Sequence, residues 1–123
     1  MDVHGQQKVL IVDDEPDICI LFGRILSGRN LKTGYAHNLA EASSAIREDP
    51  PALVFLDNSL PDGLGVDFIP YLKKNCPETR VIVVTANDTA SDKRKAMLQG
   101  ADDFIGKPMS LKLIKRELDK LTG

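Results

Sequence analysis

Five short apolar runs alternate with segments of helical periodicity, and this alternation constrains the fold more than any other feature of the sequence. The expected strands cover residues 8–12, 31–36, 53–57, 80–85 and 101–105. Strands that alternate with helices are typical of right-handed crossovers and of one parallel sheet covered on both faces. We therefore expect an α/β fold of the flavodoxin-like type, a doubly wound (βα)5 sandwich with strand order 2-1-3-4-5. It should form a single domain over residues 1–123, with a structured core at about 8–121.

Apolar residues between these runs recur at the three- and four-residue spacing of amphipathic helices. Pro16 suits the first turn of the first helix. Asn38 and Ser110 are typical N-caps for the second and the last helix. A further helix is expected over 88–98, with Gly100 as its stop signal. Helices and strands together therefore account for nearly all of the chain.

The composition excludes several classes of protein. A formal net charge of -2 argues against direct binding to nucleic acid, which normally needs a basic surface. The sequence contains no apolar run of membrane-spanning length, so a membrane protein is not expected. Residues 1–7 lack the basic and then apolar pattern of a secretory signal, which favours a cytoplasmic location. Cys19 and Cys76 form no Cys-x-x-Cys pair, so neither a disulfide nor a zinc site is indicated.

Asp57 ends the run 53–57, which reads as a strand buried on both faces. Open parallel sheets place their ligand sites at the carboxyl ends of their strands. Asp57 would equally suit a cap of the following turn, and this stretch alone does not decide between the two interpretations. Gly63 and Gly65 predict that the connection to the next helix is loosely structured and contains tight turns.

Other polar side chains stand at the carboxyl ends of the first, fourth and fifth expected strands. Asp13 and Asp14 follow the first strand, Thr85 ends the fourth, and Lys107 follows the fifth. In the order 2-1-3-4-5 the first and third strands flank the point where the winding reverses, so Asp13, Asp14 and Asp57 should converge. Each residue has a plain alternative: Asp14 as a helix cap, Thr85 as a packing residue and Lys107 as a solvated charge. Their joint placement favours a functional site.

Three neighbouring carboxylates repel one another unless they share a cation or bind protons. Magnesium prefers oxygen ligands and usually keeps several waters, so one or two of the carboxylates, a backbone carbonyl near Ser59 and a phosphoryl oxygen would suit it. Asp57 would then be free to attack phosphorus and form an aspartyl phosphate.

Lys107 would supply a positive charge to the phosphoryl oxygens of such an adduct. Thr85 would donate a hydrogen bond that exists only after phosphorylation, and such a bond can shift a conformational equilibrium. The residues therefore indicate a phosphorylation switch.

The chain resembles the response regulator receiver domain of bacterial two-component signalling over nearly its whole length. The matching segments are the acidic pair in 9–15, Asp57 with 60–63, the hydroxyl strand end 84–86 and the lysine segment 100–108. The resemblance implies that Asp13, Asp14, Asp57 and the carbonyl of Ser59 hold Mg²⁺. It also implies that Asp57 receives its phosphoryl group from a histidine kinase or a histidine phosphotransferase.

In the family that the chain resembles, Thr85 and Phe104 occupy the switch positions. The resemblance implies that they remodel the face formed by the helix at 88–98, the strand at 101–105 and the last helix. An output domain or a target protein would bind there, and the chain would form a homodimer on phosphorylation. By the same resemblance, Ser59 and Asn87 tune the lifetime of the phosphoryl group. The chain would be a signalling phosphoacceptor and not an enzyme, and it would suit the N-terminal part of a transcriptional regulator.

Two alternatives remain at this point. A phosphatase of the haloacid dehalogenase type also uses an aspartate nucleophile with magnesium, but it normally has a second acidic residue where Ser59 stands. A flavodoxin-like flavin carrier needs a phosphate loop after the first strand, where Asp14 and Glu15 would repel phosphate.

Overall fold

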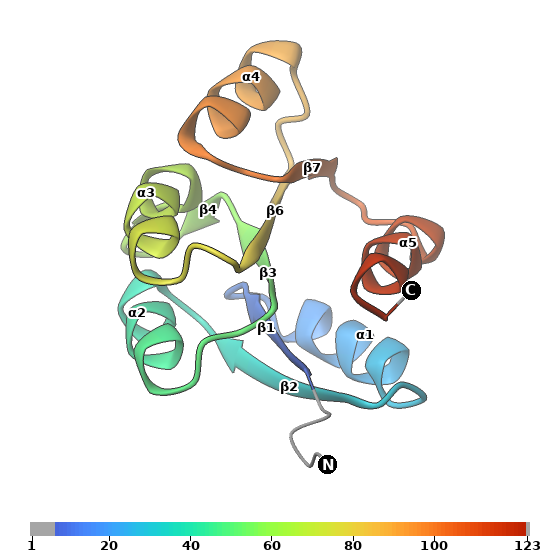
Figure 1. Ribbon diagram of the computed structural model, residues 1–123. Coiled ribbons are helices and arrows are strands. Elements are labelled where there is room, and N and C mark those ends of the chain that lie inside the picture. Colours follow the sequence, from blue (N-terminus) through green and yellow to red (C-terminus); the bar gives the residue numbers. More distant parts are fainter. Residues whose placement is uncertain (1–6, 123) are drawn as a thin grey trace.

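The computed structural model describes residues 7–122 and contains a five-stranded parallel sheet with helices on both faces (Figure 1). Its strands are β1 (Gln7–Val12), β2 (Leu31–Ala36), β3 (Leu53–Asp57), β6 (Arg80–Thr85) and β7 (Asp103–Gly106). They lie in the order β2-β1-β3-β6-β7, with parallel pairing throughout. The flavodoxin-like order 2-1-3-4-5 is thereby confirmed, since β6 and β7 are the fourth and fifth strands of this sheet.

Helices cover both faces of the sheet (Figure 1), α1 (Pro16–Leu26) and α5 (Leu111–Thr122) on one face and α2 (Leu39–Glu48), α3 (Gly65–Asn75) and α4 (Ala90–Gln99) on the other. The core on the first face of the sheet contains residues of α1 and α5. The core on the second face contains residues of α2, α3 and α4. Within residues 7–122, no helix combines the length and the apolar character needed to cross a membrane.

Strand β3 lies at the centre of the sheet, and all of its residues are buried. Successive side chains of a strand point to opposite faces. Leu53 and Phe55 therefore join the core beneath α1 and α5, whereas Val54 and Leu56 join the core beneath α2, α3 and α4. Burial on both faces explains why this run is apolar without interruption. Asp57 is the last residue of β3 and therefore lies at the carboxyl end of the central strand.

The connection after β3 is more regular than the sequence predicted. We expected a loose turn at Gly63 and Gly65, but two short antiparallel strands form there, β4 (Ser59–Leu60) and β5 (Gly63–Leu64). Gly63 has φ 153°, a backbone region that residues with a side chain rarely adopt. The carboxylate of Asp62, at the turn, accepts hydrogen bonds from Leu39 N (2.8 Å) and Ala40 N (3.1 Å). The turn is therefore fixed to the first turn of α2.

Two predicted element boundaries were wrong. The helix expected at 88–98 begins at Ala90, because Thr89 is its N-cap and accepts a hydrogen bond from Asp92 N (3.1 Å). The strand expected at 101–105 is Asp103–Gly106, because the N–H of Ala101 still bonds to the end of α4. Gly100 ends α4 with φ 114°, as its position predicted.

Candidate functional site

The acidic residues at the ends of β1 and β3 meet at one edge of the sheet. Asp13 and Asp14 follow β1, and Asp57 ends β3, its direct neighbour in the sheet. Ligand oxygens of these three carboxylates all lie within 4.8 Å of one another. Asp13 and Asp57 are only 2% and 4% exposed, whereas Asp14 is exposed to solvent. The predicted convergence of the three residues is therefore present in the structure.

Local hydrogen bonds from the backbone orient the two buried carboxylates. Oδ1 of Asp13 accepts from the N–H of Glu15 at 2.9 Å, in the turn between β1 and α1. Oδ1 of Asp57 accepts a longer bond, 3.4 Å, from the N–H of Ser59 at the start of β4. The hairpin that contains Ser59 thus begins directly beside the Asp57 carboxylate, although the Ser59 residue itself is exposed.

Lys107, which follows β7, reaches across to the carboxylates. Its Nζ lies 3.3 Å from Oδ2 of Asp13, 3.3 Å from Oδ1 of Asp57 and 2.9 Å from Oε1 of Glu15. The N–H of Lys107 donates to the carbonyl of Thr85 at 2.8 Å, which continues the pairing of β6 with β7. The peptide bond between Lys107 and Pro108 is cis. The sheet therefore places the ammonium of Lys107, at the end of β7, against the carboxylates at the ends of β1 and β3.

Burial and charge shift the titration of these groups. Burial raises the pKa of Asp57, repulsion from Asp13 raises it further, and Lys107 offsets part of the rise. Burial likewise raises the pKa of Asp13, against the opposing effects of the Glu15 N–H and of Lys107. Burial would lower the pKa of Lys107, but its carboxylate partners outweigh that effect and raise the pKa above its usual value. One lysine thus faces an excess of negative charge.

This excess of carboxylate is the chemistry that a hard divalent cation requires. Magnesium and calcium bind carboxylate and carbonyl oxygens, and magnesium is commonly held by one or two carboxylates together with phosphate oxygens and water. The oxygens of Asp13, Asp14 and Asp57 are close enough to share one ion. The residues present therefore fit a magnesium site.

Thr85 ends β6 next to this cluster. It is 3% exposed, and the residue before it, Val84, is paired with Asp57. Oγ1 of Thr85 accepts a hydrogen bond from the N–H of Asn87 at 3.0 Å. The Thr85 side chain therefore joins the end of β6 to the segment that leads into α4, and Asn87 is exposed in that segment.

Phe104 lies one strand further along the sheet, in β7, and is paired with Val83. Its ring is half-buried and packs against the core that contains Ala96 of α4. Phe104 is therefore on the face of the sheet covered by α4, not on the face covered by α5.

Glu15 is the member of the cluster that sequence reasoning did not include. It has the shortest of the three contacts to Lys107, at 2.9 Å. The signal available in the sequence was its place in the acidic run Asp13, Asp14 and Glu15 after β1. That run did not show which carboxylate would face the lysine, because the answer depends on how β7 delivers Lys107.

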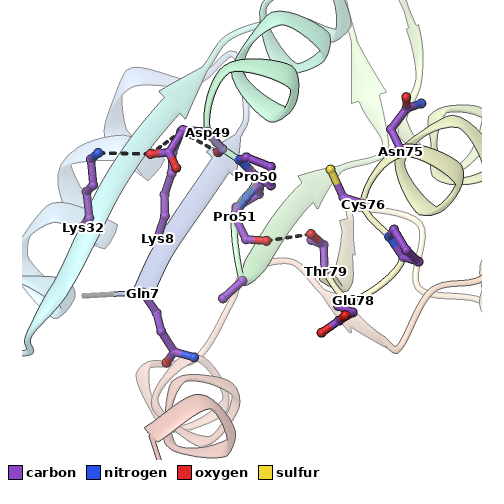
Figure 2. A pocket seen from close by; sticks show the side chains of 12 residues that line it. Gln7, Lys8, Lys32, Asp49, Pro50, Pro51, Asn75, Cys76, Glu78 and Thr79 are labelled. Carbon is purple, nitrogen blue, oxygen red and sulfur yellow. Dashed lines mark hydrogen bonds and ion pairs between the residues drawn. The ribbon is translucent and has the colours of Figure 1, made fainter. Parts of the chain in front are cut away.

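A cavity of about 610 Å³ lies at the opposite, amino-terminal edge of the sheet, away from the carboxylate cluster (Figure 2). Three of its charged residues pair with one another, since Lys32 contacts Asp49 at 3.0 Å and Lys8 contacts it at 3.8 Å. The hydroxyl of Thr79 donates to the carbonyl of Pro51 at 2.6 Å. Lys8, Lys32, Asp49 and Thr79 are thus used in internal contacts, whereas three carboxylates converge at the other end of the sheet, so the carboxylate cluster is the better candidate for the functional site.

Comparison with known proteins gives a consistent result. A family model described as the response regulator receiver domain matches residues 9–119. The response regulator protein PilR of Pseudomonas aeruginosa is 40% identical over 107 residues, which are 87% of this chain and 24% of PilR. The phosphate regulon transcriptional regulatory protein PhoB of Escherichia coli is 32% identical over 108 residues, which are 86% of this chain and 47% of PhoB.

A solved structure supports the same grouping. The solution structure of the beryllofluoride-activated NtrC4 receiver domain dimer has 34% sequence identity to this chain and a TM-score of 0.86, and the match covers 92% of this chain and 93% of the chain in that structure. The chain spans between about a quarter and a half of the length of the curated relatives described above, 24% of PilR and 47% of PhoB. The comparisons therefore favour the receiver interpretation over the phosphatase and the flavin carrier.

Proposed function

Because this chain belongs to the response regulator receiver domains of two-component signal transduction, we propose that Asp57 is the residue that accepts the phosphoryl group. The observation that carries the proposal is a buried carboxylate at the end of the central strand with an ammonium 3.3 Å away. The donor is a phosphohistidine of a histidine kinase or of a histidine phosphotransferase.

In the transfer, a carboxylate oxygen of Asp57 attacks phosphorus. The bond between phosphorus and the donor imidazole nitrogen breaks, and its electron pair returns to that nitrogen. Asp57 must be ionised to attack, although burial raises its pKa. The adjacent ammonium of Lys107 favours the ionised carboxylate and then compensates the charge on the transferring oxygens.

Asp13, Asp14, Asp57 and the backbone carbonyl of Ser59 are the proposed ligands of Mg²⁺. When bound, the ion supplies positive charge that neutralises the phosphoryl oxygens. The mutual proximity of the three carboxylates, within 4.8 Å, supports this assignment. Ser59 belongs to the hairpin that Asp62 fixes to α2, so its carbonyl is held by a segment with a defined conformation.

Thr85 and Phe104 are the proposed switch residues. The hydroxyl of Thr85 accepts a bond from Asn87 N, which leaves its hydrogen available to donate to a phosphoryl oxygen on the neighbouring strand. Movement of Thr85 toward that oxygen would pull on the segment that leads into α4. Because Phe104 packs against the core under α4, its ring would respond to the same movement. The output surface is then the face formed by α4, β7 and α5.

Ser59 and Asn87 are the residues that we assign to tuning the lifetime of the adduct. Both are exposed, and they stand two positions after Asp57 and two positions after Thr85. Exposed side chains in these places can alter the access of water to the phosphoryl group without altering the buried carboxylates.

The named relatives suggest how the signal is used. PilR and PhoB are regulators longer than this chain, and PhoB is a transcriptional regulator. We propose that this receiver likewise controls an output domain or a target protein in the cytoplasm, through the face of α4, β7 and α5 and without contacting nucleic acid itself. NtrC4 forms a receiver dimer, and a homodimer after phosphorylation is proposed here by analogy.

The direct test is incubation with acetyl phosphate and Mg²⁺, followed by intact mass measurement of the wild type and of Asp57→Asn. The proposal requires a magnesium-dependent phosphoryl adduct on the wild type and its loss in Asp57→Asn. An adduct that persists in Asp57→Asn, or its absence from the wild type, would overturn it. Multiple turnover of a phosphomonoester would instead support an enzyme of the phosphatase type.

A further inference from the structure

Glu15 is the carboxylate nearest to Lys107. Its Oε1 lies 2.9 Å from Nζ, compared with 3.3 Å for Asp13 and 3.3 Å for Asp57. Each N–H bond of an ammonium can serve a separate acceptor, so the three carboxylates can share the one cation. The position of the Lys107 ammonium is therefore set by its contact with Glu15 together with its contacts with the two buried aspartates.

Glu15 is placed differently from the proposed metal ligands. The group of carboxylates close enough to hold one ion consists of Asp13, Asp14 and Asp57, without Glu15. Glu15 occupies the N-cap position of α1, but its side chain makes no capping hydrogen bond. Its backbone serves the turn instead, since its N–H bonds to Asp13 and its carbonyl accepts from Ile18 N. The side chain is left to contact Lys107.

The exposure of the pair allows this contact to break. The Glu15 side chain is 59% exposed, while that of Lys107 is 17% exposed. An ion pair with one solvent-exposed member contributes little stability, because water solvates the freed carboxylate. A phosphoryl group on Asp57 would carry more negative charge than Glu15 and would form stronger charge-assisted hydrogen bonds.

We propose that Glu15 is a positioning residue that holds Lys107 in the unphosphorylated site and releases it to the phosphoryl group. The inference rests on the proposed function of Asp57, because the phosphoryl group on Asp57 would be the new partner of Lys107. Without Glu15, the ammonium is shared only by Asp13 and Asp57 and lies closer to the oxygens that a divalent cation needs. Glu15 thus keeps Lys107 from competing with the cation in the resting state.

Matched variants separate the contact from the charge. Glu15→Gln keeps the length of the side chain and removes its charge, whereas Glu15→Asp keeps the charge and shortens the reach. Asp17→Asn removes one charge from an exposed residue in the first turn of α1. Asp17 is outside the site, so this variant reports the effect of net charge alone.

The first measurement is the NMR signal of the Lys107 ammonium in metal-free, unphosphorylated protein. We expect Glu15→Gln and Glu15→Asp to shift this signal and speed its exchange with water, and Asp17→Asn to leave it unchanged. The inference is overturned if Glu15→Gln leaves the signal as in the wild type, or if Asp17→Asn shifts it equally.

The second measurement is the Mg²⁺ dissociation constant, obtained by NMR titration of the same proteins. Glu15→Gln should weaken binding by about two- to fivefold relative to Asp17→Asn, as expected for loss of one partly exposed ion pair. Equal constants for the two variants would contradict the inference. Neither measurement needs phosphorylation, so the absence of an adduct on the wild type overturns the proposed function, whereas an adduct with an unchanged Lys107 signal overturns only the role of Glu15.

Discussion

Nζ of Lys107 lies 3.3 Å from Oδ1 of Asp57, so the segment after β7 and the end of β3 are linked by one ion pair in the unphosphorylated site. The same ammonium touches Asp13 at 3.3 Å. A change of charge on Asp57 therefore acts directly on the segment that continues from β7 to α5, which is part of the proposed output face.

Lys107→Ala should uncouple phosphorylation from the output face. The variant loses the Lys107 ammonium but retains all three proposed carboxylate ligands, so we expect it still to bind Mg²⁺. It should lose the phosphorylation-linked change in the amide NMR shifts of α4. The control is Lys74→Ala, which removes an exposed lysine from the last turn of α3. Changes in α4 that match those of the wild type would count against the role of Lys107.

Asp57→Asn should stabilise the metal-free protein at neutral pH. Burial and then repulsion from Asp13 raise the pKa of Asp57 above 3.8, so the folded state binds this proton more tightly than the unfolded state does. The stability that this proton contributes is present below pH 3.8 and is lost as the pH rises through the folded-state pKa. Urea unfolding at pH 7 with a chelator present should therefore give a higher midpoint for Asp57→Asn. A higher midpoint for the wild type would refute this reasoning.

Gly65→Ala should destabilise the protein by about 1–3 kcal/mol, as overpacking does in a rigid core. A Cβ at Gly65 would collide with the carbonyl oxygen of Asp57 and would lie 3.0 Å from Cγ of Leu56. Gly28→Ala is the matched control, because a Cβ there meets nothing within 4 Å. We expect urea unfolding to show a change within about 0.5 kcal/mol for Gly28→Ala. Equal losses for the two variants would mean that the close approach at Gly65 is not rigid.

The N-terminus of α2 allows two capping groups to be tested separately. Asn38 accepts from Glu41 N at 2.8 Å, whereas Asp62 accepts from Leu39 N and Ala40 N. Asn38→Ala should cost about 1 kcal/mol and speed hydrogen exchange at the Glu41 amide. Asp62→Ala should speed exchange at the amides of Leu39 and Ala40 and leave Glu41 protected.

The pH dependence of the Asp62 contact follows from its hydrogen bonds. The N–H of Leu39, together with that of Ala40, lowers the pKa of Asp62 below 3.8. Its contribution is therefore present above pH 3.8 and is lost as the pH falls through the folded-state pKa. If the Leu39 amide exchanges at the same rate in the wild type and in Asp62→Ala at pH 7, the contact is absent in solution.

The strands with an uninterrupted apolar pattern could be predicted from the sequence most directly. The runs 53–57 and 80–85 match β3 and β6 residue for residue, because nearly all of their positions are buried. The run 31–36 also matches β2, although only its end residues Leu31 and Ala36 are buried. Only Ala96 of α4 is buried, so no periodic signal marked the start of that helix. The hairpin of β4 and β5 was missed because strands of two residues have no detectable period.

The site could be predicted in kind but not in its contacts. Asp13, Asp57, Thr85 and Lys107 stand at strand ends, and the order of the parallel strands places strand ends together. The role of Glu15 could not be inferred in this way. It depends on the direction in which an exposed side chain leaves the turn before α1 and on where β7 delivers Lys107.

The central claim is that Asp57 itself carries the phosphoryl group, and reduction of the treated protein with borohydride tests it most directly. Borohydride converts an aspartyl phosphate to homoserine, which peptide mass spectrometry locates in the sequence. After treatment with acetyl phosphate and Mg²⁺, we predict homoserine at position 57 and unmodified aspartate at Asp13, Asp14 and Asp62. Homoserine at one of those other aspartates, with none at position 57, would contradict the account.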